Sequence, residues 1–165
     1  MILYHPFDDV YHCFCRILLL ISRLPVEEHD IKKIQILDFY FLFPGLIKKM
    51  RWPKELNIYR QYIFGISAPY SEIPNSKAMI SHLEHQINDV IRFMAAYDLI
   101  DIDKIKKNQL LKINNIKYEP ILEKIKGYDI DLLDFLVNIL ARIPLNGKDG
   151  LKSRTGLFEY RYDND

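Results

Sequence analysis

Cysteine is scarce in this sequence, and the two cysteines that occur cannot easily be joined. Cys13 and Cys15 are two residues apart. On a helix this spacing directs the side chains to nearly opposite sides, which disfavours both a disulfide and a shared metal ion. We therefore expect free, partly buried thiols in a reducing compartment, which excludes a disulfide-stabilised secreted domain.

Net charge and long hydrophobic runs are almost absent as well. The formal charge is +1, so electrostatic binding to nucleic acid or to an acidic partner must come from a local patch. The longest aliphatic run, Ile17 to Ile21, lies between Arg16 and Arg23 and is far shorter than the roughly 20 residues of a membrane span. The N-terminus lacks the cationic region of a signal peptide. The sequence predicts a cytoplasmic protein without a membrane segment.

The remaining composition is that of an ordinary folded domain. The chain is 49% hydrophobic and 27% charged, far from the composition of disordered chains. Its 165 residues fit one compact domain, 1–165, and no repeat, low-complexity tract or linker divides them. The sequence predicts a mainly α fold with a small β component (α+β) in a single domain.

The segment from Ile34 to Gly45 is almost wholly apolar, with only Gln35 and Asp38 strongly polar. It shows neither the polar face of an amphipathic helix nor the alternation of an exposed strand. The pattern begins near Asp30 and stops at the breaker pair Pro44-Gly45, which favours a helix. We expect this helix to be buried on nearly all sides, within its own domain or against a partner chain. Asp38 then needs an Arg, Lys or backbone partner, which spacing alone does not identify.

Helical spacing of apolar residues predicts two long helices. One runs from Asp8 or Asp9 to about Leu24, and the other from Lys77 to Tyr97 with Ser76 as its cap. Their expected inner stripes are Val10, Phe14, Ile17 or Leu18, Ile21 and Leu24 in the first, and Ile80, Leu83, Ile87, Val90 or Ile91, Met94 and Tyr97 in the second. Shorter helices are expected at 46–51, 119–126 and 129–143, with residues 54–76 mostly irregular.

Two short strands are expected in the second half of the chain. Residues 109–113 followed by an Asn-Asn turn resemble the wing that follows the last helix of a winged helix-turn-helix. If a wing exists there, Lys112 and Lys117 could contact phosphates. The tail from Leu157 to Tyr162 alternates with period two and also predicts a strand.

No group of residues forms a convincing catalytic or metal site. His82 and His85 lie one helical turn apart, but both helical zinc signatures are absent, and an ordinary histidine pair is favoured. The glycine-rich stretch 146–156 lacks the Gly-x-x-x-x-Gly-Lys-Ser/Thr pattern, so backbone turns with a solvated basic rim are favoured over a phosphate loop. The paired carboxylates Asp101/Asp103 and Asp129/Asp131 are interpreted as helix caps. The sequence predicts a non-enzymatic protein without cofactor or metal.

Basic and aromatic residues are mixed between positions 48 and 62. The basic residues are Lys48, Lys49, Arg51, Lys54 and Arg60, and Trp52, Tyr59 and Tyr62 lie among them. Such mixing suits a nucleic-acid backbone, but it also suits an ordinary solvated helix and loop, which is the favoured alternative. If this segment binds DNA, the expected contacts are Lys48, Lys49, Arg51 and Arg60.

Three stretches resemble a known family. They are Tyr4-His5-Pro6-Phe7-Asp8 with Tyr11-His12, then Ile36-Leu-Asp-Phe-Tyr40 to Phe43-Pro44, and Gly150-Leu-Lys-Ser-Arg-Thr-Gly-Leu157 to Tyr160-Arg-Tyr-Asp163. Together they are similar to the small middle component of bacterial ABC-three-component conflict systems, the group that includes Lamassu anti-phage defence. The resemblance spans nearly the whole chain, from near residue 4 to 163.

The resemblance implies a winged-helix-like accessory subunit without enzymatic activity. Such a subunit would bridge an ATPase similar to structural-maintenance-of-chromosomes (SMC) proteins and an effector, often a nuclease, in defence against phage or plasmids, with DNA as a further partner of the complex. Under this hypothesis Phe39, Tyr40 and Phe43 are core or partner-facing, and Lys152, Arg154 and Arg161 form a polar contact surface. The alternative hypothesis is a stand-alone winged-helix regulator that binds DNA.

Overall fold

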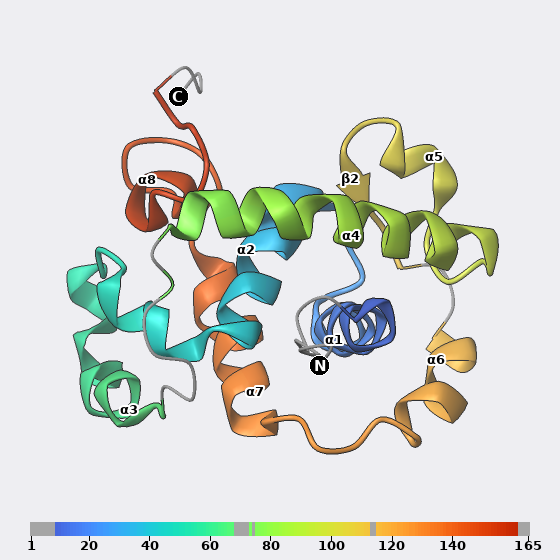
Figure 1. Ribbon diagram of the computed structural model, residues 1–165, viewed down its shortest axis with the longest axis horizontal. Helices are drawn as coiled ribbons and strands as arrows, with labels where there is room; N and C mark the ends of the chain where they lie inside the picture. Colours follow the sequence, from blue (N-terminus) through green and yellow to red (C-terminus); the bar gives the residue numbers. More distant parts are fainter. Residues whose placement is uncertain (1–8, 68–72, 74, 113–114, 162–165) are drawn as a thin grey trace, which may run out of the picture.

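The computed structural model describes residues 9–67, 73, 75–112 and 115–161. Four helices form the body of the molecule: α1 (Val10–Arg23), α2 (Ile31–Leu42), α4 (Ser76–Ala96) and α7 (Ile130–Asn138). Helix α2 lies at the centre and packs against α1, α4 and α7 (Figure 1). The short elements around them are β1 (His29–Asp30), η2 (Pro44–Lys49), η3 (Lys54–Tyr59), α3 (Arg60–Gly65), α5 (Ile102–Ile105), β2 (Gln109–Leu110), α6 (Asn115–Leu122), η4 (Leu140–Arg142) and α8 (Leu151–Thr155). The predicted mainly α class with a small β part is confirmed.

Side-chain caps set the starts of the main helices. The Asp9 carboxylate accepts hydrogen bonds from the backbone N–H groups of Tyr11 at 2.7 Å and His12 at 3.2 Å, as expected. Asp129 caps α7 in the same way. Helix α4 is capped by Asn75 rather than by the predicted Ser76, because the Asn75 side chain reaches the N–H of Ala78.

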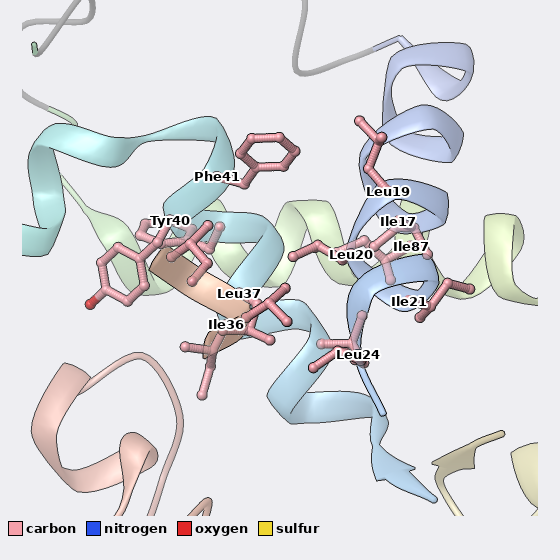
Figure 2. Close-up of a cluster of buried hydrophobic side chains, with 14 of the residues drawn as sticks. Ile17, Leu19, Leu20, Ile21, Leu24, Ile36, Leu37, Tyr40, Phe41 and Ile87 are labelled. Carbon is pink, nitrogen blue, oxygen red and sulfur yellow. The ribbon is translucent and has the colours of Figure 1, made fainter. Parts of the chain in front are cut away.

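The apolar central segment is buried as predicted. Nine of the twelve α2 residues are buried, and Ile36 and Leu37 have no exposed surface. Figure 2 shows Ile36 and Leu37 of α2 on one side of the cluster, and Leu20 of α1 with Ile87 of α4 close together on the other. Full burial of each such side chain stabilises the fold by roughly 1.5–3 kcal/mol relative to exposure. The segment therefore anchors the domain.

The predicted inner stripe of α1 is wrong at its first residue. Val10 is 58% exposed, whereas the whole run from Cys15 to Ile21 is buried. The reason is that α2, α4, α6 and α7 pack around α1 and leave no solvent face along this run (Figure 1). The predicted inner stripe of α4 is wrong at its last residue, because Tyr97 lies past the last turn of the helix and is 61% exposed.

A wing is not confirmed. Strand β2 exists, but its antiparallel partner is β1, with His29 opposite Leu110. Asn115, the second residue of the predicted Asn-Asn turn, is the first residue of α6, and the described residues contain no strand paired with β2 other than β1. The winged helix therefore stays a prediction.

The predicted strand at the C-terminus is wrong for its described part, 157–161. Gly156 has a left-handed conformation (φ 66°) that ends α8 and turns the chain. Leu157 then packs into the core, and the residues that follow form bends and a turn. Alternation of apolar and polar residues did not produce a strand here, because the described part of the chain has no neighbouring strand with which this tail could pair. Tyr162 lies outside the described residues.

Candidate partner-binding surfaces

The buried carboxylate of α2 has an arginine partner. Arg16 Nε lies 2.7 Å from Asp38 Oδ1, and Nη2 lies 3.1 Å from Oδ2. The side chains are 3% and 0% exposed. This two-point pair joins the middle of α1 to the middle of α2, so Asp38 is a structural residue of the core.

The three aromatic candidates for partner contact also lie in the core. Phe39, Tyr40 and Phe43 are 1%, 2% and 4% exposed. The ring centroid of Phe39 lies 5.5 Å from that of Tyr40 and 5.3 Å from that of Phe43. Burial raises the pKa of the Tyr40 hydroxyl. These residues were expected to be either core or partner-facing, and the structure places all three in the core. A partner would contact these rings only if the core opened.

Two arginines join α8 to the segment after η2. The backbone N–H of Arg51 donates to the Arg154 carbonyl, and Arg154 Nη1 donates to the Arg51 carbonyl, both at 3.0 Å. Arg51 Nη2 also donates to Ser153 Oγ at 2.7 Å. Arg154 Nη2 lies 2.9 Å from Asp149 Oδ1. We call this set of contacts the arginine clamp. The clamp includes Arg51, a predicted DNA contact, and Arg154, a predicted partner contact. Both side chains therefore form hydrogen bonds within the fold.

The other predicted contact residues remain at the surface. Lys49, Arg60 and Arg161 are exposed. Lys152 is half-buried on α8. Lys48 is half-buried as well, and its Nζ donates to the Ile66 carbonyl at 2.9 Å.

The two lysines assigned to the wing have structural contacts. Lys112 is 8% exposed, and its Nζ donates to the Ser22 carbonyl at 3.2 Å at the C-terminal end of α1. The phosphate contact that a wing would have given Lys112 is not supported, because its ammonium instead satisfies carbonyls that the helix end leaves open. Burial lowers the pKa of Lys112. Lys117 Nζ lies 3.3 Å from the Tyr97 carbonyl and 3.5 Å from Asp98 Oδ2, just past α4.

An apolar groove between α1, α4 and α6 was missed by the sequence reasoning. It has a volume of about 940 Å³. Its lining residues are Val10, Tyr11, Phe14, Asp89, Val90, Phe93, Tyr97, Leu99, Lys117 and Ile121, and we call it the aromatic groove. Tyr11, Phe93 and Tyr97 are 64%, 50% and 61% exposed. The available signal was that Tyr11 and Phe93 are large aromatic residues outside the inner stripes of their helices.

A second groove, with a volume of about 650 Å³, lies between η3 and the loop from η4 to α8. Its apolar lining includes Leu56, Ile58, Tyr59, Ile139 and Ile143. The loop of the glycine-rich stretch forms its other wall. Residues 146–150 of this stretch form bends and turns, whereas residues 151–155 form α8, so the expected backbone turns cover only its first part.

The sequence analysis singled out few residues for chemistry, and the structure shows where they lie. They contain no group of three or more His, Cys, Asp and Glu side chains placed to hold a metal ion. His82 and His85 are both exposed on α4. Burial raises the pKa of Cys13 to about 12, so this thiol is held in its unreactive protonated form. None of the described helices has the length and apolar character needed to cross a membrane.

The fold and the two grooves described above define a small, mainly α-helical protein with surfaces suited to binding other molecules. The chain belongs to the family described as ABC-three component (ABC-3C) system Middle Component 5, whose model matches residues 2–163. It is therefore an accessory subunit of an ABC-three-component system and acts with other components of that system. No curated protein and no solved structure matches the chain.

Proposed function

We propose that this middle component is a non-catalytic bridge between an SMC-like ABC ATPase and an effector such as a nuclease, in an anti-phage or anti-plasmid system of the Lamassu type. Family membership supports a role among other components. A bridge needs two separate contact surfaces. The aromatic groove lies toward the end of the molecule that carries α6, and the second groove lies toward the end that carries α8 (Figure 1).

The observation that carries the proposal is the aromatic groove. Monomeric soluble proteins rarely leave large contiguous apolar patches exposed, and aromatic side chains dominate binding energy at interfaces. The charged residues that line the groove are Asp89 and Lys117, and each has an opposite charge nearby, Arg92 at 3.3 Å and Asp98 at 3.5 Å. The groove therefore offers an apolar surface with little net charge. This chemistry suits the apolar face of a helix from the ATPase.

Changing Phe93 to glutamate tests the proposal. The Phe93 ring contacts Phe14 edge-to-face at 5.7 Å and lies 4.6 Å from Tyr97, measured between ring centroids, so a carboxylate there places charge in the middle of the groove. We expect Phe93→Glu to weaken co-purification with the ATPase at least tenfold, when the neighbouring genes are expressed together and the ATPase is pulled down.

The matched control is Ile102→Glu. Ile102 is 60% exposed and does not line the groove, so this change adds the same charge at a similarly open site. Co-purification is expected to remain within twofold of wild type. If the wild-type chain recovers no ATPase, or if both variants bind equally well, the proposed bridge through this groove is wrong.

A second candidate role is direct contact with duplex DNA. Lys48 and Arg60 line a hollow of about 200 Å³ together with Trp52 and Phe64, which combines cations with rings that stack on bases. The alternative regulator hypothesis requires such a surface.

Charge reversal at Lys49 and Arg60 tests this role. Both side chains are exposed, whereas Arg51 is part of the arginine clamp and is left unchanged. If the isolated chain binds duplex DNA, the double reversal is expected to lower affinity and to reduce the slope of log K against log salt by about 2. The control is reversal of Lys124 and Lys126, exposed lysines after α6. An equal loss in the control pair would show binding without a defined surface.

A further inference from the structure

The second groove combines an apolar floor with a basic rim. Leu56, Tyr59 and Ile139 are half-buried and Ile143 is 7% exposed, so together they form a floor that solvent reaches. Ile58 is 80% exposed at the wall. An apolar side chain of a partner could bury its surface here against residues that the fold already holds in place.

The charges that line this groove are unbalanced. The basic residues are Arg142, Lys148 and Arg154, and the acidic ones are Glu55 and Asp149. Arg154 and Asp149 lie 2.9 Å apart and neutralise each other. The exposed side chains of Arg142 and Lys148 therefore face Glu55 alone, which leaves an excess of positive charge beside the apolar floor.

The loop that carries Lys148 is held in one conformation. The backbone N–H of Leu151 donates to the Pro144 carbonyl at 2.8 Å, and that of Lys152 donates to the Leu145 carbonyl at 3.1 Å. The arginine clamp adds a bond from Arg51 Nη2 to the Lys148 carbonyl at 3.0 Å. A rim fixed in this way loses little conformational freedom when a ligand binds, so the groove is preorganised.

We infer that the second groove binds a short acidic segment of another component of the system, in which an apolar side chain is flanked by carboxylates. The apolar side chain fills the floor beside Leu56 and Ile143, and the carboxylates pair with Arg142 and Lys148. The source of the segment rests on the proposed bridging function. The chemistry of the groove rests on its own lining.

Peptide binding by the full chain tests this inference without any other component. The probe is a fluorescein-labelled peptide, Ser-Asp-Glu-Leu-Asp-Glu-Ser, and its binding is measured by fluorescence anisotropy. We expect saturable binding that is at least tenfold weaker for the neutral peptide Ser-Asn-Gln-Leu-Asn-Gln-Ser. Replacing the central leucine by alanine is expected to weaken binding at least threefold, because the floor loses its apolar contact.

Variants of the protein locate the binding site. Arg142→Glu combined with Lys148→Glu is expected to weaken binding of the acidic peptide at least tenfold, because both rim cations are reversed. Ile58→Ser tests the apolar wall at an exposed position and is expected to weaken binding at least twofold. The control is Lys124→Glu with Lys126→Glu, which makes the same charge change at exposed lysines outside the groove and should leave binding within twofold. Circular dichroism shows whether each variant is folded.

Several outcomes would overturn the inference. These are absence of saturable binding, equal binding of the neutral peptide, and equal losses in the rim and control variants. Binding of a twelve-base-pair duplex that depends on Arg142 and Lys148, with no peptide binding, would assign the rim to nucleic acid instead. Failure of the peptide test leaves the co-purification result at the aromatic groove standing. Failure of co-purification leaves a positive peptide result as a property of the isolated chain.

Discussion

Replacing Asp38 by alanine is expected to lower the free energy of unfolding by about 3–5 kcal/mol. The change leaves the Arg16 guanidinium, which is 3% exposed, without the carboxylate that now accepts two of its N–H groups. An uncompensated buried charge costs more than the pair contributes, because the guanidinium has lost its water and gained nothing in exchange. The effect should appear in urea denaturation as a lower midpoint with little change in slope.

Two variants separate this explanation from a general loss of contacts. Asp134→Ala removes the carboxylate that pairs with Arg23 at 3.1 Å, in a surface pair whose side chains are 51% and 33% exposed, and should cost less than about 1 kcal/mol. Arg16→Met combined with Asp38→Leu replaces both charges by apolar groups and should recover most of the stability. If Asp38→Ala lowers the free energy of unfolding by no more than Asp134→Ala does, the Arg16–Asp38 pair contributes less than expected and the core tolerates an unpaired Arg16.

The central helix could be predicted from sequence because its evidence is local. The segment around Ile36 and Leu37 is apolar in every direction, and only burial on all sides accommodates that pattern. The starts of α1 and α7 were predictable for the same reason, because Asp9 and Asp129 each cap backbone N–H groups two or three residues ahead in the chain.

Features that depend on contacts distant in sequence could not be predicted. Asp38 and Arg16 are 22 residues apart, and nothing in the spacing distinguishes Arg16 from other cations. The sequence around Lys112 predicts an exposed lysine on a strand, but the fold places the C-terminal end of α1 beside it. Strand β2 was predicted, but its partner lies before α2 rather than after the predicted Asn-Asn turn. The aromatic groove likewise exists only once α1, α4 and α6 meet.

The stretch Gly150 to Gly156, which carried part of the family resemblance, has a clear structural role. Its arginine bonds back to the segment after η2, and its last glycine takes the left-handed conformation that ends α8. These contacts fix one wall of the second groove. The residues of this motif therefore stabilise the conformation of the groove. The side chains that we expect to contact a partner are those of the nearby residues Lys148 and Arg142.

Gly150→Ala is expected to lower the free energy of unfolding by about 3 kcal/mol and to release α8 from its place. A Cβ atom at position 150 would lie 2.1 Å from the Asn146 carbonyl oxygen and 2.6 Å from the Leu145 carbonyl oxygen. Both obstacles are backbone, so no side chain can rotate away. The loop must move instead, and it would lose the bond from the Lys152 N–H to the Leu145 carbonyl.

Urea denaturation and tryptophan fluorescence measure the two effects. Trp52, the single tryptophan, directly follows the clamp residue Arg51, so release of α8 should change its emission before global unfolding. Gly65→Ala is the matched control, because its Cβ would meet nothing within 4 Å, and alanine favours a helix over glycine by up to about 1 kcal/mol.

Equal stability of the two variants would mean that the loop tolerates displacement. In that case the second groove is not preorganised, and Gly150→Ala should leave acidic-peptide binding unchanged as well. If the loop is as fixed as its contacts indicate, peptide binding should fall together with the stability of α8, because the same backbone bonds hold both.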